Sequence, residues 1–350
     1  MFDQLLSKRK SQSSLSRQEF GFLQEEILQN KVGLAVFLEL FEELERNSIQ
    51  LEEFLGAVKA SQKYTQKVQT NHQTLDIVGT GGDGLHTFNI STLAALVVAS
   101  CGVKVAKHGN RVASGLAGTA DTLENLGVKI DLDATKTGYI LDQIGFCFCF
   151  AKSFNPAFRF VAEARKTWGK PTYFNFLGPT LNPTSPSFMV LGVNNYTMTD
   201  FLGKAILEND PQTNQIKSKN RRVWVLKSED GLDEIGPESN TRVTDFRILD
   251  QKITTQELII NPSDFVSQKS YLSQIQVQTA TEASTVFRQV LQNQATPTQV
   301  ETVCLNAAAG LLVSGKVENL ETGFEMAREV LASGKTLTLF TKFVDLSNQL

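Results

Sequence analysis

From Leu75 onward, short apolar segments alternate with helix-like segments, and this alternation leaves few folds open to the chain. The strand-like segments are LDIVG (75–79), VKVAKHG (103–109), VKIDL (128–132) and, later, RRVWVL (221–226). The helix-like segments that end at a glycine are STLAALVVASCG (91–102), TADTLENLG (119–127), VETVCLNAAAGLLVSG (300–315) and LETGFEMAREVLASGK (320–335). Alternation at this pitch is typical of parallel βαβ units. The sequence therefore predicts an α/β fold with a mostly parallel central sheet and surrounding helices.

The amino-terminal part of the chain has a different pattern, which predicts a small helical domain. Ser16, followed three residues later by Glu19, is the reciprocal capping pattern of a helix start. Apolar residues then recur at spacings of three and four, without strands marked by glycine or proline. We expect a helical domain over residues 1–70, joined by helices from about 155–185, and an α/β domain over 71–350.

Composition narrows the possible partners and the cellular setting. A net charge of -3, from 34 Lys and Arg against 37 Asp and Glu, gives no basic field for nucleic acid. No apolar run approaches the roughly 20 residues of a membrane span, so we expect no membrane partner. Four cysteines lack the spacing of a zinc or redox site, which favours buried free thiols and a reducing, cytoplasmic setting. Three histidines argue against a multi-histidine metal site.

A glycine-rich loop lies between the first predicted strand and the helix after it. Gly79, Gly81, Gly82 and Gly84 remove the side chains that would keep an anion away from the backbone. The helix start that follows carries Asn89, Ser91 and Thr92, and its free N–H groups and dipole favour a phosphate. The spacing matches neither a Walker A loop nor a dinucleotide fingerprint, and the loop carries its own acid, Asp83.

The second predicted strand ends in KHGN, and parallel neighbours would bring Lys107 and Asn110 to the rim of the same loop. Lys107 would offer a positive charge to the anion and Asn110 an amide, although a solvated surface lysine is the alternative. For His108 we expect a satisfied histidine in the core.

Two further features suggest a cation and a carboxylate. Asp233 and Glu234 are adjacent acids that repel unless a cation neutralises them, and magnesium commonly binds such carboxylates beside substrate phosphates. A solvated acidic turn is the alternative. Arg165 has the guanidinium fork that matches a carboxylate in two bonds, or else it faces solvent. The loop FNFLGPTLNP (174–183) is rigid and would shape a hinge or a wall.

Five motifs in order, GTGGDG, TFNIST, KHGN, FNFLGPTLNP and DGLDE, resemble those of the anthranilate phosphoribosyltransferases. The resemblance covers nearly the whole chain, and a weaker one extends to the pyrimidine nucleoside phosphorylases. It implies transfer of a phosphoribosyl group from phosphoribosyl pyrophosphate to the amine of anthranilate, with Mg²⁺, in tryptophan biosynthesis. It also implies a homodimer joined through the helical domain, with domain closure over the substrates.

The resemblance carries over residue by residue. The residues implied for phosphoribosyl pyrophosphate are Gly79, Gly82, Asp83, Thr87, Asn89, Ile90, Ser91, Thr92, Lys107 and Thr119, the last where the family usually has serine. Those implied for magnesium are Ser91, Asp233 and Glu234, and those for anthranilate are Gly79, Asn110 and Arg165, with Arg165 towards the carboxylate. No protein nucleophile is expected, because charge stabilisation and alignment suffice for such a transfer.

Some positions depart from the family pattern. Asn155 and Phe158 stand in NPAF where His-Pro-Ala-Met is typical, Gly115 follows Ser114 where two serines are usual, and Thr180 replaces leucine. The polar segment before Arg221 is also longer. Because Asn155 and Phe158 would lie near the acceptor channel, these departures concern the acceptor more than phosphoribosyl binding.

Three alternatives to an anthranilate enzyme remain open from the sequence. A paralogue could use another aromatic amine. A pyrimidine nucleoside phosphorylase would hold inorganic phosphate in the glycine loop, and the acids of DGLDE argue against it. A non-catalytic binding paralogue would keep the fold without turnover.

Overall fold

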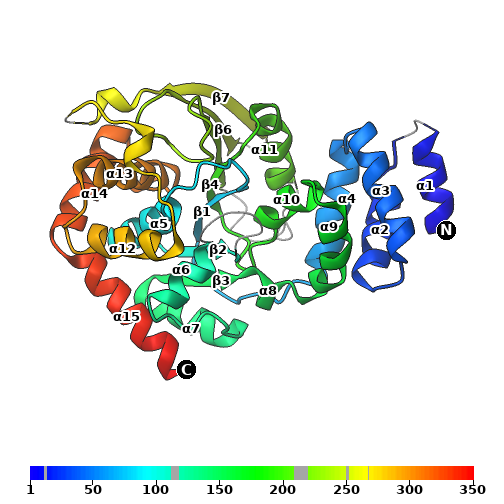
Figure 1. Ribbon diagram of the computed structural model, residues 1–350, viewed down its shortest axis with the longest axis horizontal. Coiled ribbons are helices and arrows are strands. Elements are labelled where there is room, and N and C mark those ends of the chain that lie inside the picture. The colour runs from blue at the N-terminus through cyan, green and yellow to red at the C-terminus, as the bar shows by residue number, and fades with distance from the viewer. Residues whose placement is uncertain (12–13, 112–117, 209–219, 250–251, 267) are drawn as a thin grey trace.

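The computed structural model describes residues 1–11, 14–111, 118–208, 220–249, 252–266 and 268–350. In this part of the chain, seven strands form one sheet in the order β3-β2-β1-β4-β5-β6-β7 (Figure 1). The strands are β1 (Leu75–Gly79), β2 (Val105–Gly109), β3 (Phe146–Phe150), β4 (Phe188–Gly192), β5 (Arg222–Ser228), β6 (Thr241–Leu249) and β7 (Lys252–Ile260). The first five are parallel, and β6 and β7 continue the sheet in antiparallel pairing. The predicted mostly parallel α/β sheet is confirmed.

Helices cover both faces of this sheet. On one side lie α5 (Ile90–Ser100), α12 (Ala280–Leu291), α13 (Pro297–Val313) and α14 (Leu320–Ala332), with α15 (Lys335–Gln349) below them (Figure 1). On the other side lie α10 (Tyr173–Leu177) and α11 (Thr199–Glu208). The shorter connections contain α6 (Thr119–Asn125), α7 (Ala134–Ile144), α8 (Ala151–Phe154) and α9 (Ala162–Trp168). Apolar residues at most positions of α5 explain why all of its residues except Ser91 and Ser100 are buried.

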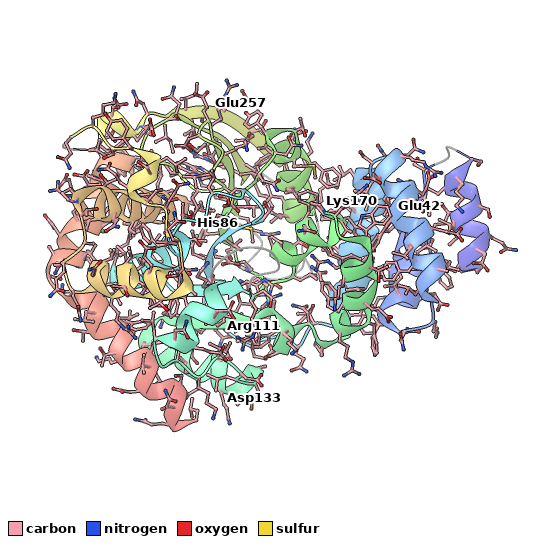
Figure 2. All side chains as sticks on the ribbon, viewed as in Figure 1. Glu42, His86, Arg111, Asp133, Lys170 and Glu257 are labelled. Carbon is pink, nitrogen blue, oxygen red and sulfur yellow. The ribbon has the colours of Figure 1, made fainter. Side chains whose placement is uncertain are left out.

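The amino-terminal helices form a separate end of the molecule (Figure 1). They are α1 (Phe2–Lys10), α2 (Arg17–Leu28), α3 (Leu34–Arg46) and α4 (Leu51–Gln62). The predicted capping box is present, since Ser16 Oγ accepts from the Glu19 N–H and the Glu19 carboxylate accepts from the Ser16 N–H. Charged side chains cover the surface at both ends, among them Glu42 and Lys170 on the helical end and Glu257 on the larger part (Figure 2).

The buried apolar residues fall into two clusters that meet at the sheet. One contains α5, α13 and the sheet face towards them. The other joins the amino-terminal helices to α9, α10, α11 and the opposite face of β4 and β5. A buried polar chain runs through the second cluster, because Tyr173 Oη donates to Gln24 Oε1 at 2.6 Å and Gln24 Nε2 donates to Ser61 Oγ at 3.0 Å. The helical end therefore reaches the sheet through the segment that contains α10.

One predicted strand was wrong, and the strands β3, β4, β6 and β7 were missed. Residues 128–132 form no strand, although Val128, Ile130 and Leu132 are buried alternately. Period-two burial alone does not place a segment in the sheet, and the position beside β2 is occupied by β3. The five residues of β3 are all buried, and its Cys147 and Cys149 are free thiols as predicted.

Two other expectations can be compared with the structure only where it describes the chain. Residues 209–219 of the polar segment before Arg221 lie outside them. Among the helices that the structure describes, none combines the length and apolar character needed to cross a membrane.

A buried ion cluster holds the amino-terminal helices together. Arg9 is 3% exposed, and its guanidinium donates to both carboxylate oxygens of Glu53 at 2.9 and 3.1 Å and to Glu43 Oε1 at 3.2 Å. The same group donates to the carbonyls of Asn47 and Ser48. Glu43 and Glu53 are themselves buried, and Arg9 is the cation that pairs with both of them among the described residues.

Arg9→Ala is expected to lower the free energy of unfolding by about 3–5 kcal/mol, because two carboxylates would stay buried without their cation. Urea unfolding followed by circular dichroism measures this change. Lys10→Ala is the matched control, since Lys10 pairs with Glu39 on the surface and its loss is expected to change stability by less than about 1 kcal/mol. Equal effects of the two substitutions would contradict a structural role for the cluster.

Candidate active site

Three neighbouring parallel strands end in glycine at one edge of the sheet. These residues are Gly79 of β1, Gly109 of β2 and Gly192 of β4. The loop after β1 runs to Asn89, the residue that precedes the first turn of α5. The glycine loop is therefore placed at the carboxyl edge of the sheet, beside a helix amino terminus, as the sequence predicts.

The glycine loop needs its glycines for its backbone conformation. Gly81, Gly82 and Gly84 have φ values of 69°, 80° and 73°, in the left-handed region that side chains disfavour. His86, with φ of 55°, continues this pattern in the same loop (Figure 2). A methyl group added to Gly81 or Gly84 would meet no atom within 4 Å, so this face of the loop is open. Among the described residues, the N–H groups of Gly82, Asp83 and Gly84 make no hydrogen bond.

Both ends of the glycine loop are anchored by hydrogen bonds, whereas the backbone N–H groups in its middle are available to a ligand. At the first end, the Thr80 N–H donates to the Gly192 carbonyl at 2.9 Å. At the second end, residues 86–88 bond to 275–277, with Thr87 bridged to Gln276 in antiparallel fashion. The loop is thus preorganised, with unpaired backbone donors between two fixed points.

The acidic turn, residues 230–236, lies directly on this loop. Asp233 Oδ2 accepts from the Gly81 N–H at 2.6 Å, and Glu234 Oε1 accepts from the Ser91 N–H at 2.9 Å. The approach depends on glycine, because a methyl group on Gly79 would lie 2.2 Å from Asp233 Oδ2 and one on Gly192 would lie 1.5 Å from the Asp233 carbonyl oxygen. The alternative of a solvated turn is excluded, since Asp233 is buried.

The carboxyl groups of this turn have strongly perturbed pKa values. Burial raises the pKa of Asp233 to about 6, and the nearby carboxylate of Asp83 contributes to that shift. Burial also raises the pKa of Glu234 to about 8, with a contribution from Asp233. Three acids thus meet at one place with too little positive charge, which is the situation that a bound cation relieves.

Lys107 does not lie on the rim, so its predicted position was wrong. It occupies the middle of β2, is 2% exposed, and its Nζ donates to the Ile77 carbonyl at 2.7 Å and to Ser91 Oγ at 3.4 Å. Burial lowers the pKa of its ammonium group, while Asp76 and Glu234 oppose that change. The side chain extends beneath the loop because residues inside a strand point to the faces of a sheet. The alternative that Lys107 is a solvated surface lysine is also excluded, because its side chain is buried.

Hydroxyl and amide groups link the starts of α5 and α6. Thr92 Oγ1 lies 3.4 Å from Thr119 Oγ1, and Thr122 Oγ1 donates to Asn89 Oδ1 at 2.5 Å. Ile90, by contrast, is buried in the apolar core, so its side chain is not available to a ligand. Thr122 was not among the predicted residues, although its position one helical turn after Thr119 places the two on one face of α6.

A second buried polar network lies deeper in the sheet, near the starts of β1 and β2, and was also missed. Asp76 accepts from the His108 N–H at 3.1 Å and from Asn182 Nδ2 at 2.8 Å, and burial raises the pKa of Asp76 to about 6. Burial lowers the pKa of His108 to about 4. His108 is a core residue as expected, and its ring bonds to the Gly178 backbone, but its Nε2 has no partner within the described residues, so the expectation of a satisfied ring is confirmed only in part. Asn182 belongs to the hinge-like loop, residues 174–183, and its side chain bonds this loop to β1 and β2.

The residues predicted for the aromatic acid are more scattered. Asn110 is exposed and its Oδ1 accepts from the Arg111 N–H. Arg165 lies in α9, is partly buried, and donates to Asn175 Oδ1 at 3.3 Å. Burial lowers the pKa of Arg165. Within the described residues, no hydrogen bond joins Arg165 to Asn110 or to the glycine loop.

The departures from the family pattern have structural partners. Asn155 is buried and its Oδ1 accepts from Thr65 Oγ1 at 2.7 Å, whereas Phe158 packs edge-on against Phe174. Thr180 Oγ1 donates to the Leu177 carbonyl within the hinge-like loop. Ser114 and Gly115 lie outside the described residues.

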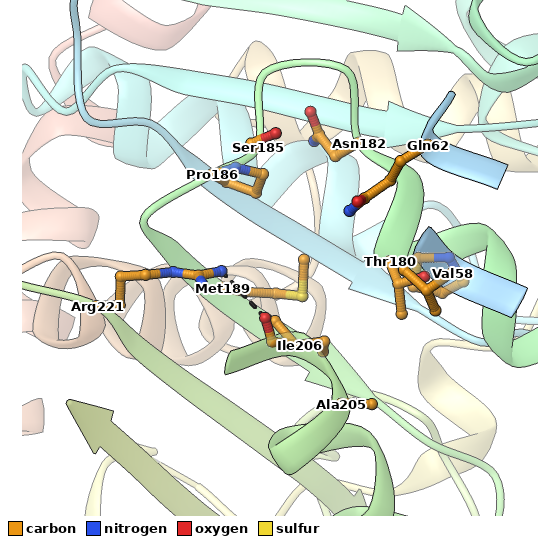
Figure 3. A pocket seen from close by; sticks show the side chains of 11 residues that line it. Val58, Gln62, Thr180, Asn182, Ser185, Pro186, Met189, Ala205, Ile206 and Arg221 are labelled. Atoms are coloured by element: carbon orange, nitrogen blue, oxygen red, sulfur yellow. Dashed lines mark hydrogen bonds between the residues drawn. The ribbon is translucent and has the colours of Figure 1, made fainter. Parts of the chain in front are cut away.

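A cavity of about 30 Å³ lies at the opposite edge of the sheet, between α4, the hinge-like loop and α11 (Figure 3). Met189 and Ser185 line it near the start of β4, and Arg221, which closes one side, donates to the Ile206 carbonyl. The cavity has room for one or two water molecules and is remote from the glycine loop.

Nothing in the described residues gathers three or more histidine, cysteine or acidic side chains into a complete metal site. Magnesium fits the residues present nevertheless, because it commonly takes one or two carboxylates and completes its shell with water and substrate phosphates. Asp233, Glu234 and the Ser91 hydroxyl are the hard oxygen donors of this edge.

A family model, relatives in sequence and solved structures all point to the same family. A family model described as "Glycosyl transferase family, a/b domain" matches residues 71–337. An anthranilate phosphoribosyltransferase of Syntrophomonas wolfei is 38% identical over 296 residues, which cover 85% of this chain and 83% of the relative.

Solved structures extend the similarity to the whole chain. The crystal structure of the anthranilate phosphoribosyltransferase from Thermus thermophilus has a TM-score of 0.87 and 30% identity, over 98% of this chain and 99% of the other. The enzyme from Saccharomyces cerevisiae, in complex with PRPP and Mg, has a TM-score of 0.85 and 26% identity over 99% of each chain. Another structure of the yeast enzyme contains 4-fluoroanthranilate.

Gly192→Ala is expected to lower the free energy of unfolding by about 1–3 kcal/mol, because the new methyl group would overlap the Asp233 carbonyl and push the acidic turn away. Urea unfolding measures the effect. Gly178→Ala is the control, since its added methyl group would meet no atom within 4 Å and its backbone is helical. If both variants are as stable as the parent, the turn is not held by this contact.

Proposed function

The chain belongs to the anthranilate phosphoribosyltransferase family, and we propose that it transfers the phosphoribosyl group of phosphoribosyl pyrophosphate to the amine of anthranilate, releasing pyrophosphate. One observation supports this above the others. Asp233 contacts the loop that presents unpaired backbone N–H groups, and Glu234 contacts the first turn of α5 beside it, so anion donors and hard cation ligands share one edge. A diphosphate that travels with magnesium needs both.

The proposed leaving-group site consists of the glycine loop and the first turn of α5. Cleavage at the anomeric carbon leaves negative charge on pyrophosphate, and fixed N–H donors of Gly82, Asp83 and Gly84 stabilise that charge without reorganising. Magnesium, held by Ser91, Asp233 and Glu234, would neutralise the charge that develops on the pyrophosphate oxygens. Lys107 contributes positive charge from beneath the loop rather than by direct exposure.

The proposed sugar-phosphate site uses the polar groups between α5 and α6. Asn89, Thr92 and Thr119, with Thr87 from the loop, present hydroxyl and amide groups at two adjacent helix starts. Their task is to fix the ribose so that the amine approaches in line with the departing pyrophosphate. No protein nucleophile is required for this displacement.

The proposed acceptor site lies between the glycine loop and α9. Gly79, Asn110 and Arg165 would face anthranilate, with the Arg165 guanidinium on its carboxylate. Arg165 is partly buried and has only an amide oxygen as its side-chain partner among the described residues, so its charge is available to an acid. Asn155 and Phe158 would lie near the acceptor channel, and they would determine which aromatic amine is accepted.

Further parts of the proposal concern organisation and setting. The helical part, residues 1–70 with helices from about 155–185, and the α/β part, residues 71–350, would act as two domains that close over the substrates. We propose a homodimer joined through the helical domain. Free cysteines, three of them buried, suit a reducing cytoplasm, where tryptophan biosynthesis would use the product.

A pyrimidine nucleoside phosphorylase is the weaker candidate. Its glycine loop would hold inorganic phosphate, and three acids beside that anion would only repel it. A non-catalytic paralogue has no specific observation in its favour.

Incubating the protein with phosphoribosyl pyrophosphate, Mg²⁺ and anthranilate is expected to deplete the fluorescence of anthranilate. Asp233→Ala combined with Glu234→Ala is expected to slow this depletion by at least about 100-fold, because charge stabilisation at the leaving group is lost. The melting temperature of the double variant checks that the fold is retained. Depletion of another aromatic amine but not of anthranilate would redirect the proposal to a paralogue.

The affinity for Mg²⁺ in the presence of pyrophosphate is expected to rise between pH 6 and pH 8. The pKa values of about 6 for Asp233 and about 8 for Glu234 lie above the ordinary values, so the free protein holds protons that must leave when the metal binds. Calorimetry at pH 7 in two buffers of different ionisation enthalpy should therefore show proton release. The Asp233→Asn, Glu234→Gln double variant is expected to release none from these positions.

A further inference from the structure

Two further backbone N–H groups beside the proposed site are already hydrogen-bonded to side chains of the protein. The Gly81 N–H bonds to Asp233 at 2.6 Å, and the Ser91 N–H bonds to Glu234 at 2.9 Å. Each N–H has one proton, and a second acceptor can share it only at reduced strength. A phosphate oxygen and the carboxylate therefore compete for the same donor.

We propose that the N–H groups of Gly81 and Ser91 are diphosphate donors that Asp233 and Glu234 keep closed in the ligand-free protein. The carboxylates exchange these donors for a divalent cation that arrives with the diphosphate. The inference rests on the proposed function, and it adds that the metal ligands are also internal competitors of the anion.

The geometry permits an exchange by side-chain rotation alone. The backbone of the acidic turn is held from behind, because the Ile235 N–H donates to Asn306 Oδ1 at 3.0 Å and Asn306 Nδ2 donates to the Ile235 carbonyl at 2.9 Å. The loop is held at both ends, and the open face at Gly81 leaves room for the incoming anion. Neither backbone has to move for the donors to change partners.

The charges at this place oppose an anion that arrives without a cation. Asp83, Asp233 and Glu234 are mutually repelling groups, and Lys107 is the positive group that acts on both members of the acidic pair. A diphosphate without metal adds further negative charge to this place. Binding of metal-free pyrophosphate is therefore opposed both by the acidic charges and by the occupation of two donors. The metal and the anion bind cooperatively.

Two substitutions at Glu234 separate these two effects. Glu234→Gln removes the acidic group but keeps an oxygen that can accept from the Ser91 N–H, whereas Glu234→Ala removes the acidic group and frees the donor. Titration calorimetry with inorganic pyrophosphate in a chelator measures binding without metal. We expect Glu234→Ala to bind at least about 10-fold more tightly than the parent and several-fold more tightly than Glu234→Gln. Asp233→Asn and Asp233→Ala repeat the comparison at Gly81.

Equal affinities of the Ala and Gln variants would overturn the competition for donors, and no gain in any variant would overturn the inference as a whole. A measurement on the unsubstituted protein is independent of folding of the variants. The amide NMR signals of Gly81 and Ser91 are expected to shift with Mg²⁺ and pyrophosphate together and to stay in place with pyrophosphate and chelator. Signals that stay in place in both conditions would also overturn it.

The two levels of proposal fail separately. Binding of pyrophosphate with the predicted pattern, but no consumption of anthranilate, would refute the proposed function and leave the exchange intact. Consumption of anthranilate with equal Ala and Gln variants would do the reverse.

Discussion

The contact of Asp233 with Gly79 and Gly192 is the constraint on which the rest of the site depends. Parallel strands bring their carboxyl ends to one edge, so the loops after β1 and β4 become neighbours. Glycine at both strand ends removes the side chains that would keep the acidic turn at a distance. A turn far along the chain thereby comes into hydrogen-bonding range of the glycine loop and of α5.

This packing creates an electrostatic imbalance that has a functional meaning. The raised pKa values of Asp233 and Glu234 follow first from burial and then from neighbouring acids. A stable protein tolerates such a cluster where binding of a partner offsets its cost, and perturbed acids in this arrangement mark functional sites. The buried ammonium of Lys107 balances the acids only in part, because Asp76 also draws on it.

The helical end of the molecule is connected to the sheet by two buried polar networks. Tyr173 and Gln24 join α10 to the amino-terminal helices. Asn182, a few residues later, bonds Asp76 and the Ala106 carbonyl and so fixes the hinge-like loop on β1 and β2. The amino-terminal helices and strands β1 and β2 are therefore joined through one segment, residues 173–182.

The sequence by itself determined the parallel α/β architecture, the glycine loop at a helix start and the acids opposite it, because strand and helix periodicity, glycine content and motif order are local properties. Only the tertiary structure decided that residues 128–132 stay unpaired while 146–150 form the strand beside β2, since pairing depends on which neighbour is available. It also decided that Lys107 lies under the loop and that Asp233 and Glu234 hold the N–H groups of Gly81 and Ser91. These contacts join residues distant in the chain, and their direction follows from how the elements pack.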